Sequence, residues 1–470
     1  MKLSILAATS ALLGTTSCLY AQAAGTPYIP QIQIPFSFLT GGTYDDTPLA
    51  IDNTSDGGYI VIGTTNSSAT GDITDTSHGA SDFWVVKYDS VGKREWQRLY
   101  GGSGNDYGYS IRQTIDGGYI MGGFVAGVSP NTGDVGPGKG GNADAWVAKL
   151  TSTGAISWQK TYGGNQADFL RTIIPLSDGY IFLGNAQSVD QDVSGGVGRF
   201  WVLRTDLNGT SSWHNTYNSP NGAGEIPYSM APSGDGNGYI LVGYTPSNNS
   251  DALIMKINNS GAVQWKKVYG GSQRDIAYAT APSSDGGSIV VCGSESSANG
   301  NVAGTNNGAE DIWILKLDAS GNISWQQLYG GSAADRAYSV QQTSDGGYIV
   351  AGTSASSGTG NVTGTNKGGS DIWLLKLSSG GVIQWQKLYG GSGSEGSIPT
   401  GLNTYQPITV NARQTPDGGY VVTAGSRSSQ SGDVTDTTNN GSGSTANNDY
   451  WLFKTDASGN IVEVPDVGQR

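Results

Sequence analysis

The tryptophans of this chain constrain its fold more than any other feature, because they recur at fixed places in a repeated unit. All 12 fall at two positions of that unit. The first position holds Trp84, Trp146, Trp201, Trp313, Trp373 and Trp451, and the second holds Trp96, Trp158, Trp213, Trp265, Trp325 and Trp385. Large aromatic side chains that keep to a period are packing elements of a repeat architecture. They therefore predict a fold and do not name a reaction or a ligand.

Each repeated unit contains four strand-like segments. In the unit of residues 335–389 an Asp-Gly turn at Asp345 separates the first two segments, and this pair of residues is a strong hairpin signal because both tolerate positive φ. The same turn recurs at Asp56, Asp116, Asp178, Asp235, Asp285, Asp345 and Asp417. Seven units of four short strands, without a helical period, predict an all-β fold: a seven-bladed β-propeller of four-stranded antiparallel blades. A β-solenoid is the alternative, but its repeats are shorter and usually parallel.

The two ends of the chain complement each other. The seventh unit has Trp451, but Glu463 stands where the second tryptophan is expected. The missing aromatic strand is found at 32–40, with Phe36 at the tryptophan position. We therefore predict that the N-terminal strand completes the last blade and closes the ring, which removes an exposed sheet edge. The segment 461–464 competes for that place or adds outside it.

The N-terminus has the features of a secretory signal peptide. Lys2 precedes an apolar stretch, and Ala21-Gln22-Ala23 forms an A-x-A cleavage site. We predict a signal peptide over 1–23, a linker over 24–31 and one propeller domain over 32–470, in a secreted or cell-surface protein. Lipid attachment at Cys18 is the alternative, although Thr15 is a poor match to the aliphatic residue expected there. No later segment is apolar enough to be a transmembrane helix.

Charge excludes some partners. The net charge is −13, and only 13% of residues are charged. An acidic surface of this kind argues against a basic patch for nucleic acid, and it is compatible with cations, neutral glycans or a basic protein.

The motifs of the unit resemble the tandem repeats of secreted bacterial and archaeal surface proteins that are thought to be β-propellers. Their pattern is W-x3-Y-G-G-S-x2-D, then D-G-G-Y-I-V-x-G, then D-x-W-x2-K-L-D, and the segments 388–392 and 311–318 are close matches. The resemblance covers nearly the whole mature chain and implies an extracellular scaffold or binding role without a catalytic motif. More distantly, 318–321 followed by Trp325 is similar to the tryptophan-docking repeats of quinoprotein propellers.

Several charged residues repeat in every unit or nearly so. An acid follows the Gly-Gly pair at Asp46, Asp106, Asp168, Asp275, Asp335 and Glu395; a second acid occurs at Asp82, Asp144, Asp251, Asp311, Asp371 and Asp449; and a base occurs at Lys87, Lys149, Arg204, Lys256, Lys316, Lys376 and Lys454. A catalytic group is needed once per molecule, so repetition favours ion pairs and turn caps over catalysis.

The long loop of each unit carries a Gly-Asp or Gly-Asn signature. Asp72 with Asp75, and Asp433 with Asp436, come closest to a calcium site, because carboxylate oxygens are the ligands that calcium prefers. The simpler interpretation is an Asx turn with a buried Val or Ile. We expect no other cofactor.

Breaks in the repeat are the better candidates for function, because the fold does not demand those residues. Unit four has no long loop after Tyr244, unit three has Arg199 in place of the strand Asp, and unit seven carries an insertion over 394–409 with Asn403, Tyr405 and Gln406. Loops and insertions on one face of a scaffold are natural binding elements. We predict ligand-binding roles for these five residues.

The sequence shows no nucleophile set, metal spacing or phosphate loop. The first hypothesis is therefore a non-enzymatic binding or scaffold protein for an extracellular glycan, protein or matrix ligand, active in adhesion or assembly. The alternatives are a secreted glycan-active hydrolase or lyase at a break in the repeat, which needs only two carboxylates, and a purely structural subunit. Carboxylates and aromatics in the central channel that do not repeat would favour the hydrolase.

Overall fold

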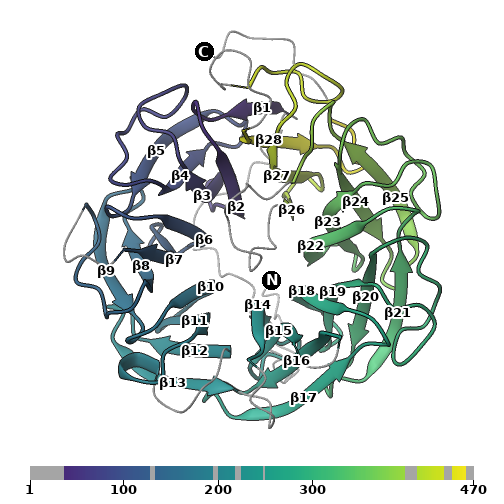
Figure 1. The fold of residues 1–470 in the computed structure, drawn as a ribbon, viewed down its shortest axis with the longest axis horizontal. Coiled ribbons are helices and arrows are strands. Elements are labelled where there is room, and N and C mark those ends of the chain that lie inside the picture. The colour runs from purple at the N-terminus through teal and green to yellow at the C-terminus, as the bar shows by residue number, and fades with distance from the viewer. Residues whose placement is uncertain are drawn as a thin grey trace, which may run out of the picture.

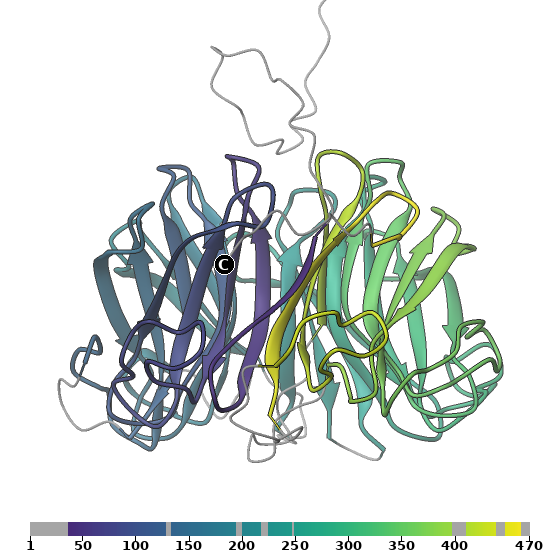
Figure 2. The same ribbon diagram turned by 90° about the horizontal axis from the view of Figure 1, so that it is seen from above.

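A computed structural model describes residues 36–127, 133–193, 200–217, 224–246, 249–396, 410–438 and 447–461. The strands in these ranges form seven four-stranded antiparallel sheets, arranged around a centre like the blades of a propeller (Figure 1). Seen from the side, the strands run between the two faces of the ring (Figure 2). The predicted seven-bladed β-propeller is confirmed. No helix of the described residues is long and apolar enough to span a membrane.

The blades are built from consecutive strands. Blade 1 contains β2 (Asp46–Asn53), β3 (Tyr59–Thr65), β4 (Asp82–Tyr88) and β5 (Arg94–Tyr100); blade 2 contains β6 (Asp106–Gln113), β7 (Tyr119–Ala126), β8 (Ala143–Leu150) and β9 (Ile156–Tyr162); blade 3 contains β10 (Asp168–Leu176), β11 (Gly179–Ala186), β12 (Phe200–Thr205) and β13 (Ser211–Tyr217), with the 3-10 helix η1 (Gln191–Val193). Blade 4 contains β14 (Ile226–Pro232), β15 (Tyr239–Thr245), β16 (Asp251–Ile257) and β17 (Val263–Tyr269); blade 5 contains β18 (Asp275–Pro282), β19 (Ser288–Ser294), β20 (Asp311–Leu317) and β21 (Ile323–Tyr329); blade 6 contains β22 (Asp335–Gln342), β23 (Tyr348–Ser354), β24 (Asp371–Leu377) and β25 (Ile383–Tyr389).

The seventh blade joins the two ends of the chain. It contains β26 (Val410–Gln414), β27 (Tyr420–Ser426), β28 (Asp449–Thr455) and, as its outermost strand, β1 (Ser37–Thr40). β1 pairs antiparallel with β28, with Leu39 opposite Trp451 (Figure 1). Ring closure by the N-terminal strand is therefore confirmed. Ile461 forms one bridge with Thr455, while residues 32–35 and 462–464 lie outside the described residues.

The core lies within and between the blades. The tryptophans of the first set are buried in the third strand of their blades, and Trp84 Nε1 donates to Gln97 Oε1 of the neighbouring outer strand at 2.7 Å. In the last blade Trp451 donates to Ser37 Oγ at 3.0 Å, so β1 supplies the acceptor that an outer glutamine provides in blades 1, 2, 5 and 6. Buried clusters combine side chains of adjacent blades, so that each blade stabilises the next.

The tryptophans of the second set join neighbouring blades. Five of them donate from Nε1 to a carbonyl in the turn that follows the third strand of the next blade, at 3.0 to 3.2 Å: Trp96, Trp158, Trp265, Trp325 and Trp385. The ring of Trp325 lies against Gly381 of that turn, where a Cβ would come within 2.8 Å of the ring. Tyr329 OH donates to the carbonyl of the same glycine. The contact needs a residue with no side chain, because an added Cβ would displace the indole.

Candidate functional site

The repeated bases form structural ion pairs within their own blades. Each one reaches the Asp of the Asp-Gly hairpin turn at 2.5 to 2.9 Å: Lys87–Asp56, Lys149–Asp116, Arg204–Asp178, Lys256–Asp235, Lys316–Asp285, Lys376–Asp345 and Lys454–Asp417. Burial alone would raise the pKa of Asp345, but hydrogen bonds from Lys376 and Thr343 outweigh it and lower the pKa to about 2. The repeated bases and the turn Asp residues therefore stabilise the hairpins through these ion pairs.

The repeated acids after Gly-Gly act as turn caps. Asp106 Oδ2 accepts the backbone N–H of Gly102 at 2.5 Å, and Asp335 Oδ2 accepts that of Gly331 at 2.7 Å. Both carboxyls are buried. The expectation that the repeated charges are structural is therefore confirmed for these residues.

The loop acids that were candidates for calcium contact backbone amides. Asp72 Oδ2 accepts the N–H of Gly41, Asp75 Oδ2 that of Leu99 and Asp436 Oδ2 that of Leu39, at 3.1 to 3.2 Å. Asp433 accepts the N–H of Gly390 at 3.0 Å and forms an ion pair with Lys367. Among the residues that the structure describes, no group of three His, Cys, Asp or Glu side chains could hold a metal ion. Calcium binding stays a prediction.

The predicted ligand-binding residues fall mostly in segments that the structure leaves out. Arg199, Asn403, Tyr405 and Gln406 lie outside the described residues. Tyr244 lies on β15, and its ring stacks on Tyr228 with centroids 5.8 Å apart. Only Tyr244 can therefore be related to neighbouring groups.

Charges that do not repeat come together between blades 5 and 6. They are Arg274, just before β18; Glu295, just after β19; Glu310, just before β20; and Arg336 on β22. We call these four residues the charged cluster. The positions of Glu310 and Arg336 carry uncharged residues in the other blades, such as Ser81 and Tyr107, and the positions of Arg274 and Glu295 are charged elsewhere only at Asp45 and Arg427. The repeat therefore does not account for the charged cluster.

Glu310 is the centre of the charged cluster. Its Oε2 lies 3.0 Å from Arg274 Nη2 and 2.7 Å from Arg336 Nε, and Arg274 Nη2 also reaches Glu295 at 2.6 Å. The Glu310 side chain is only 4% exposed, whereas those of Arg274 and Arg336 are 38% and 42% exposed. Burial opposes the charge on Arg336, but Glu310 outweighs it and raises the arginine pKa. The buried carboxylate thus fixes two guanidinium groups that remain open to solvent.

Tyrosines on the innermost strands connect the charged cluster with Tyr244. Tyr278 OH lies 3.4 Å from Glu310 Oε1, and its ring contacts Tyr228 and Tyr338 at centroid distances of 5.4 and 5.8 Å. Each of these three tyrosines occupies a β-bulge of its strand, where the ladder register shifts. Burial raises the Tyr278 pKa well above its usual value. The tyrosines form a rigid base for the charged groups.

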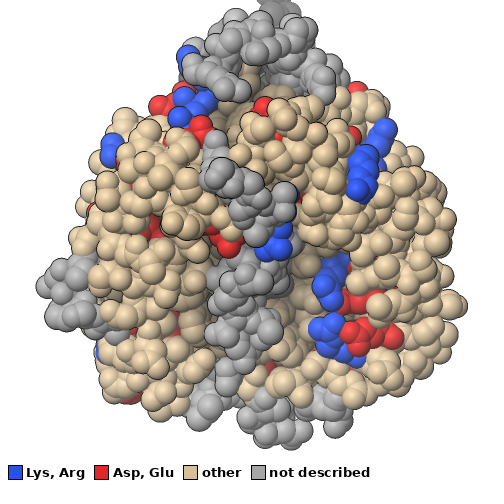
Figure 3. All heavy atoms as spheres, turned by 45° about the horizontal axis from the view of Figure 1, so that its top comes forward, with Lys and Arg blue, Asp and Glu red and all other residues tan. Residues whose placement is uncertain are grey.

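The charged cluster lies beside the short connection of blade 4. The connection between β15 and β16 covers only 246–250, whereas the corresponding connections of blades 5 and 6 cover 295–310 and 355–370. Basic and acidic side chains lie side by side at the surface in the lower right part of Figure 3, where most other surface atoms belong to uncharged residues. A ligand of this face would find concentrated charge here.

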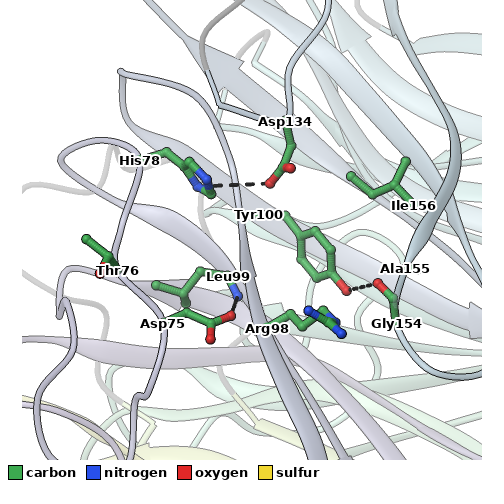
Figure 4. Close-up of a pocket in the computed structure, with 10 residues that line it drawn as sticks. All are labelled: Asp75, Thr76, His78, Arg98, Leu99, Tyr100, Asp134, Gly154, Ala155 and Ile156. Carbon is green, nitrogen blue, oxygen red and sulfur yellow. Dashed lines mark hydrogen bonds and ion pairs between the residues drawn. The ribbon is translucent and has the colours of Figure 1, made fainter.

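Apart from the charged cluster, a hollow with a volume of about 520 Å³ lies between blades 1 and 2 (Figure 4). His78 faces it, with Nδ1 3.9 Å from Asp134 and 3.5 Å from the buried Asp82. Tyr100 OH donates to the Gly154 carbonyl at 2.5 Å, as at the other blade junctions. The polar groups that line this hollow largely hold the two blades together. Among the described residues, no hydroxyl of Ser or Thr and no Cys thiol is hydrogen-bonded to His78.

Comparisons with known proteins bear on the fold alone. No protein-family model matches the chain, and no curated protein matches it. Among solved structures it is similar to YCF48 bound to D1 peptide, with 11% identity, a TM-score of 0.45 and coverage of 93% of this chain and 99% of the other. It is also similar to the Neurospora crassa Pan2 WD40 domain, with 13% identity, a TM-score of 0.38 and coverage of 75% of this chain and 90% of the other. A third similar structure is an ancestral GH74 enzyme, with 12% identity, a TM-score of 0.42 and coverage of 83% of this chain and 48% of the other.

Proposed function

We propose that the protein is a secreted or cell-surface binding protein that holds an extracellular ligand at the charged cluster between blades 5 and 6. The observation that carries this proposal is the convergence of four charges that do not repeat. Every other charge considered above serves a hairpin, a cap or a loop contact. Arg274, Glu295, Glu310 and Arg336 serve no repeated structural role, and they meet at one place.

The chemistry of the charged cluster favours an acidic glycan as the ligand. Glu310 contacts Arg336 through Nε, and the guanidinium group also hydrogen-bonds Tyr338, but it is 42% exposed, so its remaining N–H groups can donate to a ligand. A guanidinium group binds carboxylates and similar anions through two parallel hydrogen bonds. Glu310 holds the guanidinium plane in place, which reduces the entropy lost on binding.

The test is binding of residues 24–470 to an array of neutral, uronate-bearing and sulfated glycans. We expect saturable binding to acidic glycans that Arg336→Ala weakens at least tenfold. Lys93→Ala is the matched control, because it removes one positive charge from an exposed turn of blade 1. Binding that Arg336→Ala and Lys93→Ala reduce equally would refute the site, and the absence of any glycan or protein ligand would favour a purely structural subunit.

A secreted hydrolase or lyase is the second candidate, because two carboxylates contact the same nitrogen. Arg274 Nη2 lies 2.6 Å from Glu295 Oε1 and 3.0 Å from Glu310 Oε2. Two neighbouring carboxylates are the minimum that glycoside hydrolysis needs. Acidic polysaccharide incubated with the protein would then be shortened, and Glu310→Gln would abolish the shortening. Intact polysaccharide after binding would exclude this candidate for that substrate.

A further inference from the structure

Carboxyl groups of neighbouring blades meet in pairs around the ring. The acid that begins the third strand of one blade lies beside the acid that begins the first strand of the next blade. At the junction of blades 1 and 2, a Cβ placed on Gly101 would lie 2.4 Å from Asp82 Oδ1 and 2.6 Å from Asp106 Oδ2. The same arrangement is found for Asp144 with Asp168, around Gly163.

In four of these pairs one oxygen has no hydrogen-bond partner among the described residues. Asp82, Asp144, Asp311 and Asp371 are all fully buried, and in each the atom without a partner is Oδ1, the oxygen nearest the glycine. The other oxygen accepts a backbone N–H; Asp311 Oδ2, for example, accepts that of Asn307 at 2.8 Å. A buried oxygen without a partner is costly, so its recurrence at equivalent places calls for a physical explanation.

A proton between the two carboxyls provides that explanation. We propose that these inter-blade carboxyl pairs each bind one proton, with the third-strand acid donating from Oδ1 to Oδ2 of the first-strand acid. Two neighbouring buried carboxyls cannot both ionise cheaply, because each charge is poorly solvated and repels the other. A protonated Oδ1 becomes a donor and gains the partner that it lacks.

The electrostatics agree with this geometry. Burial, together with the neighbouring acid of each pair, raises the pKa of Asp106 to about 7 and the pKa values of Asp144 and Asp311 to about 6. Asp335 is the charged group that raises the pKa of Asp311. His78 and Asp134 face Asp82, Lys139 faces Asp144, and Lys367 and Asp433 face Asp371. The pair of Asp311 and Asp335 is therefore the simplest to test.

A metal ion fits the pairs less well than a proton. Calcium takes six to eight oxygen ligands, whereas each pair supplies two carboxylates whose remaining oxygens already accept N–H groups. Asp335, for example, accepts hydrogen bonds from Gly331 N at 2.7 Å and Ser356 Oγ at 2.9 Å. Donors that point at the carboxylates stabilise negative charge and would repel a cation.

The proposal fixes the sign of the pH dependence. A carboxyl with a raised pKa holds its proton in the folded protein and loses it on unfolding, so the folded state binds more protons between the two pKa values. Stability is then highest below about pH 4 for these groups and falls as pH rises toward 7. Each such carboxyl changes the unfolding equilibrium about tenfold per pH unit in this window.

The experiment is urea unfolding of the mature chain at pH 4.5, 5.5, 6.5 and 7.5, followed by tryptophan fluorescence. Asp311→Asn places a permanent N–H donor where the proton is proposed to be. We expect the wild type to lose stability as pH rises, and the variant to lose less stability over the same range. At pH 7.5 the unfolding equilibrium constant of the variant should be at least tenfold smaller than that of the wild type. Asp318→Asn is the matched control, because the same turn position in blade 4 is Asn258, which makes the same hydrogen bonds.

Three outcomes would overturn the proposal. They are wild-type stability that is flat or rises between pH 4.5 and 7.5, an Asp311→Asn variant with the wild-type slope, and a calcium-dependent shift that EDTA reverses. If Asp311→Asn does not fold, proton release on unfolding of the wild type in weakly buffered urea at pH 5.5 tests the same claim. Release of less than one proton per chain would refute it.

Discussion

Phe36 packs against Gly92, where a Cβ would come within 2.7 Å of its ring, in the way that tryptophan packs against the turn glycine at the other blade junctions. The junction between blades 7 and 1 therefore keeps the packing and loses a hydrogen bond, because phenylalanine has no N–H to donate. The backbone of Phe36 is held within its own blade, where Lys454 N of β28 donates to the Phe36 carbonyl at 2.7 Å. The ring is therefore closed by weaker side-chain contacts than those at the five junctions where a tryptophan donates to the next blade.

We predict that Phe36→Trp stabilises the protein. The indole N–H can reach the turn of blade 1, as Trp325 reaches the Ser379 carbonyl at 3.1 Å. One such hydrogen bond contributes about 0.5 to 1.5 kcal/mol to the free energy of unfolding. Chemical denaturation measures the change, and a loss of stability would show that the site cannot hold the larger ring.

Removing one inter-blade hydroxyl should be costly. Tyr389 OH donates to the buried carbonyl of Gly459 at 2.5 Å, and Tyr389→Phe leaves that carbonyl without its donor. We expect a loss of about 1 to 3 kcal/mol in the free energy of unfolding. The loss should appear in thermal or urea unfolding, and an unchanged midpoint would mean that water replaces the hydroxyl.

Two glycines with the same backbone conformation should respond differently to alanine. Gly381 has φ +82° and Gly346 has φ +80°, so a Cβ costs about 1 to 2 kcal/mol at either. At Gly381 the Cβ would also come within 2.8 Å of the Trp325 ring, whereas at Gly346 nothing lies within 4 Å. Gly381→Ala should therefore destabilise the protein more than Gly346→Ala. Equal losses in parallel urea titrations would contradict the packing argument.

The hairpin ion pairs should weaken only at low pH. The pKa of Asp345 is lowered to about 2, so its contribution is present above its ordinary pKa near 4 and is lost as pH falls toward 2. The Asp345 side chain is 50% exposed, so solvent screening limits the contribution to about 1 kcal/mol. The stability difference between wild type and Asp345→Asn should be constant above pH 5 and shrink below pH 4. A difference that grows on acidification would reverse the assigned sign.

The sequence predicts the blades well because each blade is a local structure. The Asp-Gly turns, the alternating strands and the tryptophan period all act within one unit, and Phe36 could be aligned with the missing aromatic residue. The partners of the charges were harder to predict. Lys376 meets Asp345 of its own blade, whereas Asp311 meets Asp335 of the next, and nothing in a single unit distinguishes the two cases.

The candidate site was missed because breaks in the repeat were sought in loops. Arg274, Glu310 and Arg336 are single substitutions at or beside strand ends, and they lie far apart in the unit until two blades are packed together. Comparing the units position by position would have shown each as an exception. Their convergence depends on the inter-blade geometry, which the sequence does not specify.

Closure of the last blade by β1 also sets the order in which the molecule can be completed. Ser37–Thr40 are synthesised before the six consecutive blades, but their partner strand Asp449–Thr455 is synthesised after them. Six blades can form from consecutive segments while the seventh waits for both termini. We therefore expect ring closure to follow the synthesis of β28, and a chain truncated before residue 449 to lack the partner that β1 needs to close the ring.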